Sequence, residues 1–466
     1  MDALIWIFYK ILVPVCILGA AINIHEFGHF IVARFFKMRV EAYSFFGLGP
    51  RIWGFKRGNT DYRISAIPLG AYVKLYGDEG TSALEGGSSV GDVPKEELYE
   101  LRPRWQKFFV MLGGPFMNIV LALAIPFGMA VSSGVPKIPE PIIGVIDAGG
   151  VAEQSGLKVG DKIVAFGGTE SPDSNRIRID AAINPEKSMP ISVERAGQRV
   201  NLQIVPKKVS ILGGQEVGDL EMEPFEPVLV GVVQPNTPAQ EAGLSADDKI
   251  LKVNDVEAQN FLQVRELVQK FKAEPIKLTV ERSGKIQDLT AVVRKLEDGT
   301  ERLGFAPKKL LEPASLATAI GYAFSFNFEN LRATVSVLGQ VFSGQRSAKD
   351  AGISGPVGIF KQSAEFAQAM GWEGALVILA GISLSLGVMN LLPIPMLDGG
   401  QIMMLGVEKV YSWFGKTLSM VIRERVQLAG LAMILLLMVF VFFLDFSRMF
   451  SDTKKVEQPA ANAVQK

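Results

Sequence analysis

Four long apolar runs stand out from the mixed polar and apolar pattern of the rest of the chain. About 20 consecutive apolar residues cross a bilayer as an α-helix. The runs therefore predict membrane-spanning helices over residues 1–36, 108–133, 374–407 and 426–445. Pro393 and Pro395 interrupt the third run, so we expect that span to be irregular. The pattern predicts a polytopic α-helical membrane protein.

Positive charges near the ends of these runs predict an orientation. They collect after the first run, before the second, and between the third and the fourth: Arg34, Lys37, Arg39, Arg102, Arg104, Lys107, Lys409, Lys416, Arg423 and Arg425. Short loops rich in Lys and Arg stay in the cytoplasm. The N-terminus, the long segment 134–372 and the tail 452–466 are then predicted to lie on the outer, periplasmic side.

The cytoplasmic-side loop 37–107 contains a stretch, 40–76, in which polar and apolar residues alternate. Residues 51–55 and 60–65 have strand character and flank a turn at 57–60, which predicts a β-hairpin. The apolar, glycine-rich residues 45–49 precede it and follow the first span closely. This part dips into the membrane if protein covers its backbone groups. The alternative is an ordinary surface hairpin.

The long outer segment contains an internal repeat. Every matching pair is separated by the same number of residues: Gly144-Val145 and Gly231-Val232, Gly156-Leu157 and Gly243-Leu244, Asp161-Lys162-Ile163 and Asp248-Lys249-Ile250. A fixed period of this kind indicates a duplicated domain. We place the two copies at 140–208 and 226–308, followed by an amphipathic helical region at 313–370.

Each copy resembles a PDZ domain through its A-x-x-x-G-L-x-x-x-D-K-I spacing. PDZ domains bind an extended peptide along a sheet edge. The resemblance implies an α+β fold and two sets of peptide-binding residues: Ile142, Ile143, Gly144 and Val145, then Leu229, Val230, Gly231 and Val232. The alternative is that both grooves are closed and the copies act only as bulk.

Composition narrows the choice of partners. Hydrophobic residues make up 48% of the 466-residue chain, which fits several membrane spans and contact with the lipid bilayer. The 48 basic side chains balance the 48 acidic ones, so charge gives no reason to expect nucleic acid. The single cysteine, Cys16, cannot form an internal disulfide, and the sequence has no C-x-x-C metal motif.

Both histidines of the chain, His25 and His29, lie inside the first apolar run. Residues four apart share a helix face, so both imidazoles can bind one ion. Glu26 points about 100° away from His25, beside such an ion. This H-E-x-x-H pattern supplies two zinc ligands and a general base. Ionisable groups are costly in a bilayer, which favours a functional role over two histidines satisfied by their neighbours.

A catalytic zinc needs a third protein ligand and an open position. No further histidine exists, so the ligand is an acid or Cys16. The best candidate is Asp398, the only acid between Glu373 and Glu408. The alternative is that Asp398 caps a helix at a kink. Asn390 precedes the proline-rich break, where its amide either donates to a developing oxyanion or bonds to backbone groups that Pro393 frees.

Together these motifs resemble the site-2 protease family of intramembrane zinc metalloproteases. H-E-x-x-H in the first span, N-x-x-P-x-P-x-L-D-G-G in the third and the inserted PDZ copies cover nearly the whole chain. The resemblance implies one zinc ion held by His25, His29 and Asp398, and peptide hydrolysis inside the bilayer. It also implies that Gly47, Leu48 and Gly49 form a substrate-binding G-x-G motif in a membrane-reentrant β-element.

The family resemblance extends to substrates and location. It implies single-span substrates, namely an anti-sigma factor already trimmed by another protease in an envelope stress response, and remnant signal peptides. The enzyme would lie in the cell inner membrane with its active site near the cytoplasmic side. The main alternative is a PDZ-based membrane scaffold with a vestigial metal site. A transporter is weaker, because four spans are few and the polar Asn118 in the second span makes no pathway alone.

Overall fold

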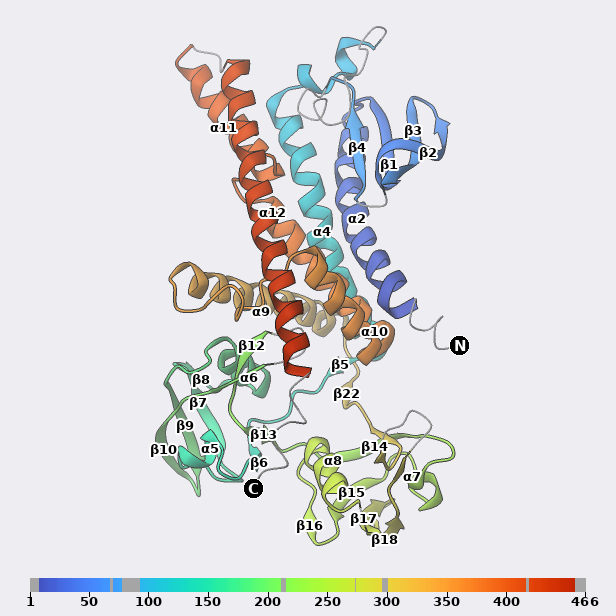
Figure 1. Cartoon of the computed structure of the whole chain (residues 1–466), viewed down its shortest axis with the longest axis vertical. Coiled ribbons are helices and arrows are strands. Elements are labelled where there is room, and N and C mark those ends of the chain that lie inside the picture. Colours follow the sequence, from blue (N-terminus) through green and yellow to red (C-terminus); the bar gives the residue numbers. More distant parts are fainter. Residues whose placement is uncertain are drawn as a thin grey trace. The chain divides into compact units, whose positions relative to one another are not determined.

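The computed structural model describes residues 8–67, 70–77, 93–210, 215–272, 274–295, 301–415 and 419–456. The chain divides into two compact units (Figure 1). The first unit comprises the described residues of 1–132 and 314–466, and the second comprises those of 133–211 and 215–313. Residues 1–7 of the predicted first helix, 78–92 of the loop 37–107 and 457–466 of the tail lie outside the described residues.

The first unit is mostly helical. Its helices are η1 (Phe8–Leu12), α2 (Val13–Phe35), η2 (Lys95–Glu97), η3 (Tyr99–Leu101), α4 (Arg104–Ser133), α9 (Leu316–Phe342), α10 (Pro356–Asn390), α11 (Asp398–Trp413) and α12 (Met420–Val456). Within the described residues, four stretches are long and apolar enough to cross a membrane: Phe8–Phe35, Arg104–Ser133, Met370–Asn390 and Val421–Ser447. The chain is therefore a polytopic membrane protein, in agreement with the four apolar runs.

The third predicted span, 374–407, is not one helix. Helix α10 ends at Asn390 and α11 begins at Asp398, with Pro393 and Pro395 in the break between them. Proline cannot donate a backbone hydrogen bond and disfavours a helical residue before it, which explains the interruption. Upstream, Gly371 (φ 65°) kinks α10 where its membrane stretch begins. The break sets Asp398 at the first turn of a new helix.

Helix α12 continues well beyond the predicted fourth span, 426–445. It runs to Val456 and so includes the first residues of the predicted tail 452–466. The residues that follow the apolar run mix polar and apolar side chains and include neither glycine nor proline up to Val456. Polarity alone does not stop a helix. The end of hydrophobicity therefore did not mark the end of the helix.

A four-stranded sheet lies beside α2 in the first unit (Figure 1). Its strands are β1 (Val40–Phe46), β2 (Leu48–Arg57), β3 (Thr60–Ile67) and β4 (Tyr72–Leu75), in the order β2-β3-β1-β4. Strands β2 and β3 form the predicted antiparallel hairpin, with Arg57 opposite Thr60. Strand β1 pairs parallel with β3 and antiparallel with β4. The two edges of the sheet are thus β2 and β4.

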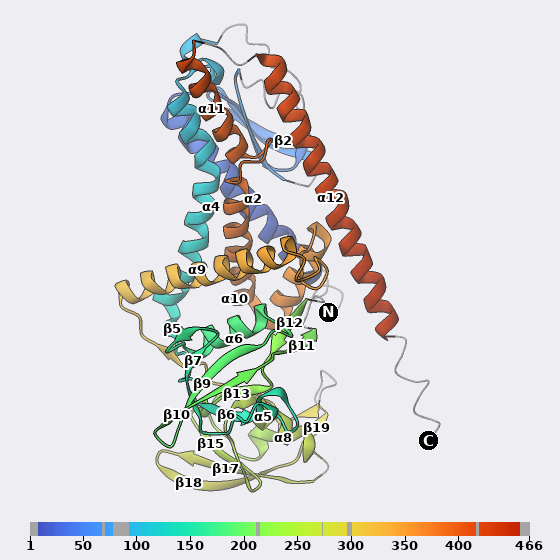
Figure 2. The same ribbon diagram turned by 90° about the vertical axis from the view of Figure 1, so that its left-hand side faces the viewer.

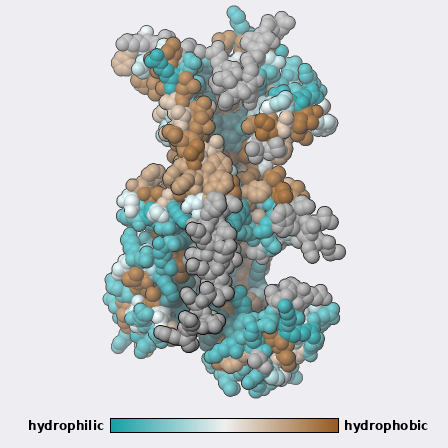
Figure 3. Space-filling view, viewed as in Figure 1, coloured by the Kyte–Doolittle hydropathy of each residue, from teal (hydrophilic) through white to brown (hydrophobic). Residues whose placement is uncertain are grey.

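Helix α9 runs across the membrane helices of its unit rather than along them (Figures 1 and 2). One line of exposed apolar side chains follows its length: Leu316, Ile320, Phe324, Phe328, Val335 and Phe342. On its other side, the buried Asn327 donates to the backbone oxygen of Ala122 on α4. Hydrophobic residues gather over the helices of the first unit, whereas the surface of the second unit is mostly hydrophilic (Figure 3).

The second unit holds the predicted repeat. Its elements are β5 (Val135–Pro136), β6 (Ile143–Ile146), α5 (Val151–Gln154), β7 (Lys162–Phe166), β8 (Thr169–Glu170), α6 (Ser174–Ile183), β9 (Met189–Arg195), β10 (Gln198–Ile204), β11 (Lys207–Ser210), β12 (Glu216–Asp219), β13 (Met222–Pro224), β14 (Val228–Val233), α7 (Pro238–Glu241), β15 (Lys249–Val253), β16 (Val256–Glu257), α8 (Phe261–Lys270), β17 (Ile276–Arg282), β18 (Lys285–Ala291), β19 (Arg294–Lys295), β20 (Glu301–Arg302), β21 (Phe305–Pro307) and β22 (Leu311–Glu312).

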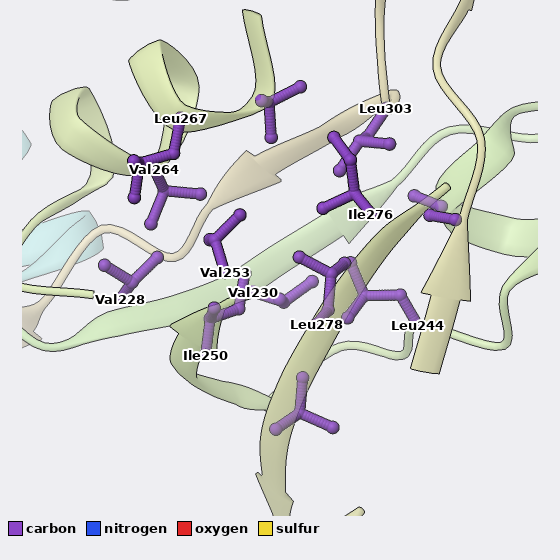
Figure 4. Packing of buried hydrophobic residues seen from close by; sticks show 14 residues of the cluster. Val228, Val230, Leu244, Ile250, Val253, Val264, Leu267, Ile276, Leu278 and Leu303 are labelled. Atoms are coloured by element: carbon purple, nitrogen blue, oxygen red, sulfur yellow. The ribbon is translucent and has the colours of Figure 1, made fainter. Parts of the chain in front are cut away.

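Each repeat has its own core and the same internal ion pair. In the second repeat, aliphatic side chains of β14, β15, β17 and α8 fill the space between sheet and helix (Figure 4). The Arg282 Nε donates to Asp248 at 2.7 Å, and in the first repeat Arg195 donates to Asp161 at 2.7 Å. Both arginines also donate to the backbone oxygen of the preceding Gly-Leu turn. The recurrence of this contact shows that the sequence repeat is also a structural repeat.

Candidate metal centre

Helix α2 brings the two histidines to one face, as their spacing predicts. The Nε2 atoms of His25 and His29 lie 3.2 Å apart, and the ring planes are nearly perpendicular. No proline follows Pro14 in α2, so this part of the chain continues as one helix through both histidines. Two imidazole nitrogens therefore point to the same small volume.

Asp398, at the start of α11, completes a group of three. Its Oδ2 lies 3.2 Å from Nε2 of His25, and its Oδ1 lies 3.4 Å from Nε2 of His29. The break after Asn390 turns the chain so that this carboxylate faces α2. Among the described residues, this is the group of His, Cys, Asp and Glu side chains that is close enough to hold a metal ion. Cys16, the other candidate for a third ligand, is exposed and lies outside the group.

The spacing of the two imidazole nitrogens and the carboxylate oxygens suits a tetrahedral metal site. Bonds of 2.0–2.1 Å in a tetrahedron place the ligand atoms about 3.3 Å apart. The distances between Nε2 of His25, Nε2 of His29 and the two oxygens of Asp398 are 3.2, 3.2 and 3.4 Å. Three protein ligands leave the fourth position open, as in catalytic rather than structural zinc sites.

The second ring nitrogen of His29 is held by the backbone of α4. Its Nδ1 lies 2.7 Å from the backbone oxygen of Val110. A carbonyl oxygen can only accept a hydrogen bond, so Nδ1 carries the proton and Nε2 keeps its lone pair. A hydrogen bond of this kind fixes the tautomer and orientation of a metal-binding histidine.

Close packing between α2 and α4 makes room for the rings. A Cβ at Gly114 would overlap Nε2 of His29 and lie 2.8 Å from Nε2 of His25. A Cβ at Gly28 would collide with the backbone of Gly113 and lie 2.8 Å from the nitrogen of Gly114. Glycine is therefore required at these positions for the two helices to approach and for both imidazoles to fit between them.

Glu26 lies beside the group of three and is held by the four-stranded sheet. The backbone nitrogen of Val73 on β4 donates to Oε2 of Glu26 at 3.1 Å. Because this bond leaves the sheet, the N–H and C=O of Val73 face away from β1. The edge strand β4 therefore runs past the residue that the sequence predicts as the general base.

Two asparagines also lie against His25. Asn390, predicted from the sequence, ends α10 and places its Nδ2 3.3 Å from Nε2 of the ring. Asn118 on α4 was not assigned to the site, yet its Nδ2 lies 3.3 Å from Nδ1 of the same ring. The signal that could have found it is its place as a strongly polar residue inside the second apolar run, where polar groups are costly.

The predicted G-x-G residues form the turn from β1 to β2. Gly47 and Gly49 have φ of +91° and +81°, in the region that glycine adopts readily. The nitrogen of Gly47 donates to the oxygen of Gly70 at 2.8 Å, which ties the turn to the segment before β4. Leu48 is exposed and begins the edge strand β2. The motif therefore shapes one corner of the sheet.

The predicted peptide-binding residues of the repeats lie on β14 and on Ile142 with β6. Strand β14 stands between β15 and β21 in its sheet, so both of its edges have partners. Strand β6 pairs with β13, and Ile142 forms a bridge with Lys162. In the second repeat β21 and β18 are the two edge strands of the sheet that contains β14, and in the first repeat β13 pairs with β6 as β21 pairs with β14.

Comparison with known proteins gives a family match over most of the chain. The model of peptidase family M50 matches residues 14–437. The regulator of sigma-E protease RseP of Escherichia coli is 30% identical over 453 residues, which cover 93% of this chain and 97% of that protein. Protease RseP of Yersinia pestis is 31% identical over 457 residues, with the same coverage of 93% and 97%. A putative zinc metalloprotease of Vibrio cholerae is 30% identical over 483 residues, covering 96% and 100%.

Proposed function

Because the chain belongs to peptidase family M50, the site-2 proteases, we propose that it is an intramembrane zinc metalloprotease that cuts peptide bonds within transmembrane segments. The observation that carries the proposal is the convergence of His25, His29 and Asp398 with tetrahedral spacing beside Glu26. These side chains belong to or adjoin helices that are long enough to cross a bilayer. A hydrolytic site at that depth suits a substrate that is itself a membrane helix.

The donor set suits zinc. Two imidazoles and one carboxylate are a ligand set of zinc hydrolases, and relatives of this chain carry the name zinc metalloprotease. His25, His29 and Asp398 would hold one ion. When bound, zinc supplies a Lewis acid that activates water and polarises the scissile carbonyl.

The side chains around the ion divide the remaining chemistry between them. The carboxylate of Glu26 accepts the proton of the attacking water and returns it to the leaving amine. The amide of Asn390, next to Nε2 of His25, donates to the oxyanion that develops on the scissile carbonyl.

The substrate strand pairs with the sheet. A transmembrane helix hides its carbonyls in backbone hydrogen bonds, so the scissile segment must first unwind and find new partners. Strand β4 is an edge of the sheet, and Val73 on it contacts Glu26. The opposite edge, β2, is three strand spacings away, about 14 Å. Addition to β4 therefore brings the substrate to the general base, while Gly47, Leu48 and Gly49, at the turn from β1 to β2, contact the substrate outside the cutting point.

Pairing of the substrate with β4 also changes the hydrogen bonding of the Glu26 carboxylate. The N–H of Val73 that a substrate strand would use is the one that Glu26 now accepts. The substrate takes over this hydrogen bond and leaves the carboxylate of Glu26 free to accept a proton. Binding of an extended substrate thus prepares the base.

The repeats act as a filter on substrates. They are inserted between the second and the third membrane stretch, in residues 140–308. Their bulk rejects substrates that keep a folded outer domain. A chain that lacks 140–308 should cleave untrimmed substrate. Continued resistance of the untrimmed substrate would place the filter elsewhere.

For the substrates, we propose two classes. The name regulator of sigma-E protease, carried by the Escherichia coli relative, supports a trimmed, single-span anti-sigma factor as substrate, with remnant signal peptides as a second class. The Lys and Arg pattern supports an inner-membrane location with the metal group near the cytoplasmic side and the repeats in the periplasm. Peptide ends that reach the repeats would add to the edge strands β21 and β13.

Glu26→Gln tests the function. The variant keeps the shape of the side chain but cannot accept a proton, so it should retain zinc and fold while losing cleavage of a single-span test substrate, by at least a factor of about 100. A membrane scaffold with a vestigial metal site would be unaffected. Full cleavage by Glu26→Gln would rule out the assigned mechanism.

A further inference from the structure

Helix α4 presents three positions, four residues apart, to the two imidazoles. The backbone oxygen of Val110 accepts from Nδ1 of His29 at 2.7 Å. Gly114 leaves the space in which both rings stand. Asn118, one turn further along, lies with its amide 3.3 Å from Nδ1 of His25 and is 0% exposed. The spacing of four on α4 matches the spacing of four between the histidines on α2.

A buried serine fixes the amide of Asn118 from the other side. The hydroxyl of Ser383 on α10 donates to the backbone oxygen of Asn118 at 2.9 Å and lies 3.3 Å from its side-chain amide. Both residues are 0% exposed, so water does not compete for these groups. Asn118 therefore connects three membrane helices beside the three candidate metal ligands: α2, α4 and α10.

Hydrogen-bond counting decides which end of the amide faces His25. The oxygen and nitrogen of an amide have the same shape, and the network sets their orientation. The Ser383 hydroxyl has one hydrogen, which the backbone oxygen of Asn118 already takes, so the group beside the hydroxyl must be the donating NH₂. The amide oxygen then faces Nδ1 of His25 and can accept a hydrogen bond from it.

We propose that Asn118 is a positioning residue for the metal centre. Its Oδ1 accepts the proton on Nδ1 of His25, so Nε2 keeps its lone pair and points toward Asp398. Asn390 does not replace this contact, because its Nδ2 lies 3.4 Å and 3.3 Å from the two ring nitrogens and favours neither. The inference rests on the proposed metal site. It adds Asn118 to the three ligands as a fourth side chain that determines how tightly the site binds zinc.

The test compares zinc affinity in matched variants of the full-length chain in detergent. Asn118→Leu keeps the branched shape of the side chain and removes both polar atoms. Asn118→Asp keeps an oxygen that accepts from Nδ1. Asn327→Leu is the control, because Asn327 is a second buried asparagine that binds a backbone oxygen of α4, that of Ala122, without touching a histidine.

Each variant is stripped of metal and titrated with Zn²⁺ against a competing chelator, with Co²⁺ absorption as a second measure of ligand geometry. We expect Asn118→Leu to bind Zn²⁺ about 10- to 100-fold more weakly, Asn118→Asp to bind within a few-fold of the unaltered chain, and Asn327→Leu to bind normally. Equal affinity in Asn118→Leu and the unaltered chain would overturn the inference. An equal loss in Asn327→Leu would also overturn it, since helix packing alone would then explain the effect.

Two further results separate this inference from the function itself. If Asn118→Leu does not fold, Ser383→Ala is the second variant, because it removes the hydroxyl that orients the amide of Asn118. Ser383→Ala should weaken Zn²⁺ binding severalfold. Unchanged Zn²⁺ affinity in Ser383→Ala counts against the inference. If the unaltered chain binds no Zn²⁺, the proposed function fails first. Normal binding and cleavage by the unaltered chain, together with normal binding by Asn118→Leu, would reject only the role of Asn118.

Discussion

A single methyl group at Gly114 should empty the metal centre. In Gly114→Ala, the new Cβ would overlap Nε2 of His29 and lie 2.8 Å from Nε2 of His25. Ordinary contact needs about 3.5 Å, so the ring of His25 must move by roughly 0.7 Å and that of His29 by more. A metal site tolerates only about 0.2 Å of error in its bond lengths. We therefore expect Zn²⁺ affinity and cleavage to fall by at least ~100-fold.

Gly128→Ala on the same helix is the matched control. A Cβ at Gly128 meets no atom within 4 Å, and alanine favours a helix over glycine by about 1 kcal/mol. Both variants should insert and fold, as judged by circular dichroism and the thermal melt of the metal-free chain. The assay measures Zn²⁺ competition with a chelator and cleavage of a single-span substrate. If Gly114→Ala binds Zn²⁺ and cleaves as Gly128→Ala does, the packing argument is wrong.

Two further predictions concern charges outside the metal centre. Burial raises the pKa of Asp248, but the hydrogen bonds from Arg282 outweigh it and hold the pKa below its ordinary value. This contribution to stability is therefore present above about pH 4 and lost as the pH falls through the lowered pKa. Arg282→Leu should destabilise the second repeat by about 3 kcal/mol near neutral pH. It should also reverse the pH dependence of stability, so that acid stabilises this repeat. Hydrogen exchange measures the stability of each repeat, with the first repeat as internal reference, and an unchanged pH profile would contradict the reasoning. In α12, Asp445 accepts from the backbone nitrogens of Gly355 and Gly358, each at 2.9 Å, at the start of α10. Asp445→Leu should weaken exchange protection there by about 1–2 kcal/mol, and full protection would show that these bonds are dispensable.

The three candidate ligands were predictable because the sequence offers few alternatives. The chain has 2 histidines, placed four apart, and Asp398 is the one acid in the third apolar run. Local spacing and scarcity are properties of the sequence itself. The break between α10 and α11 was also foreseeable, since two prolines within three residues do not fit a continuous helix.

The contacts of α4 with the imidazoles could not be predicted in the same way. They depend on the close approach of Gly28 to Gly113, which sets the distance between two helices far apart in the sequence. Asn118 stood out as a polar residue in an apolar run, but neither propensity nor periodicity says which helix it faces. The contact of Val73 with Glu26 is equally non-local, because it depends on the pairing of β4 with β1 at the edge of the sheet.

The repeats show what a regular sequence pattern leaves open about the edges of a sheet. The constant number of residues between matching positions of the two repeats holds for β6 and β14. It does not hold for the strands that pair with them. The oxygen of Glu221 accepts from Asp147, and that of Gly304 accepts from Gln234, so Glu221 and Gly304 occupy equivalent positions at a different spacing. Those residues precede the edge strands β13 and β21. The predicted residues lie one strand further in, where the repeat is easiest to recognise.

The central claim is that one zinc ion, held by His25, His29 and Asp398, is required for peptide hydrolysis by this chain. The most direct measurement is the zinc content of the purified protein, followed with its cleavage of a single-span substrate before chelation, after chelation and after zinc is restored. We predict one zinc per chain, loss of cleavage on its removal, and recovery when one equivalent is added. Cleavage that persists in the zinc-free protein would contradict the claim.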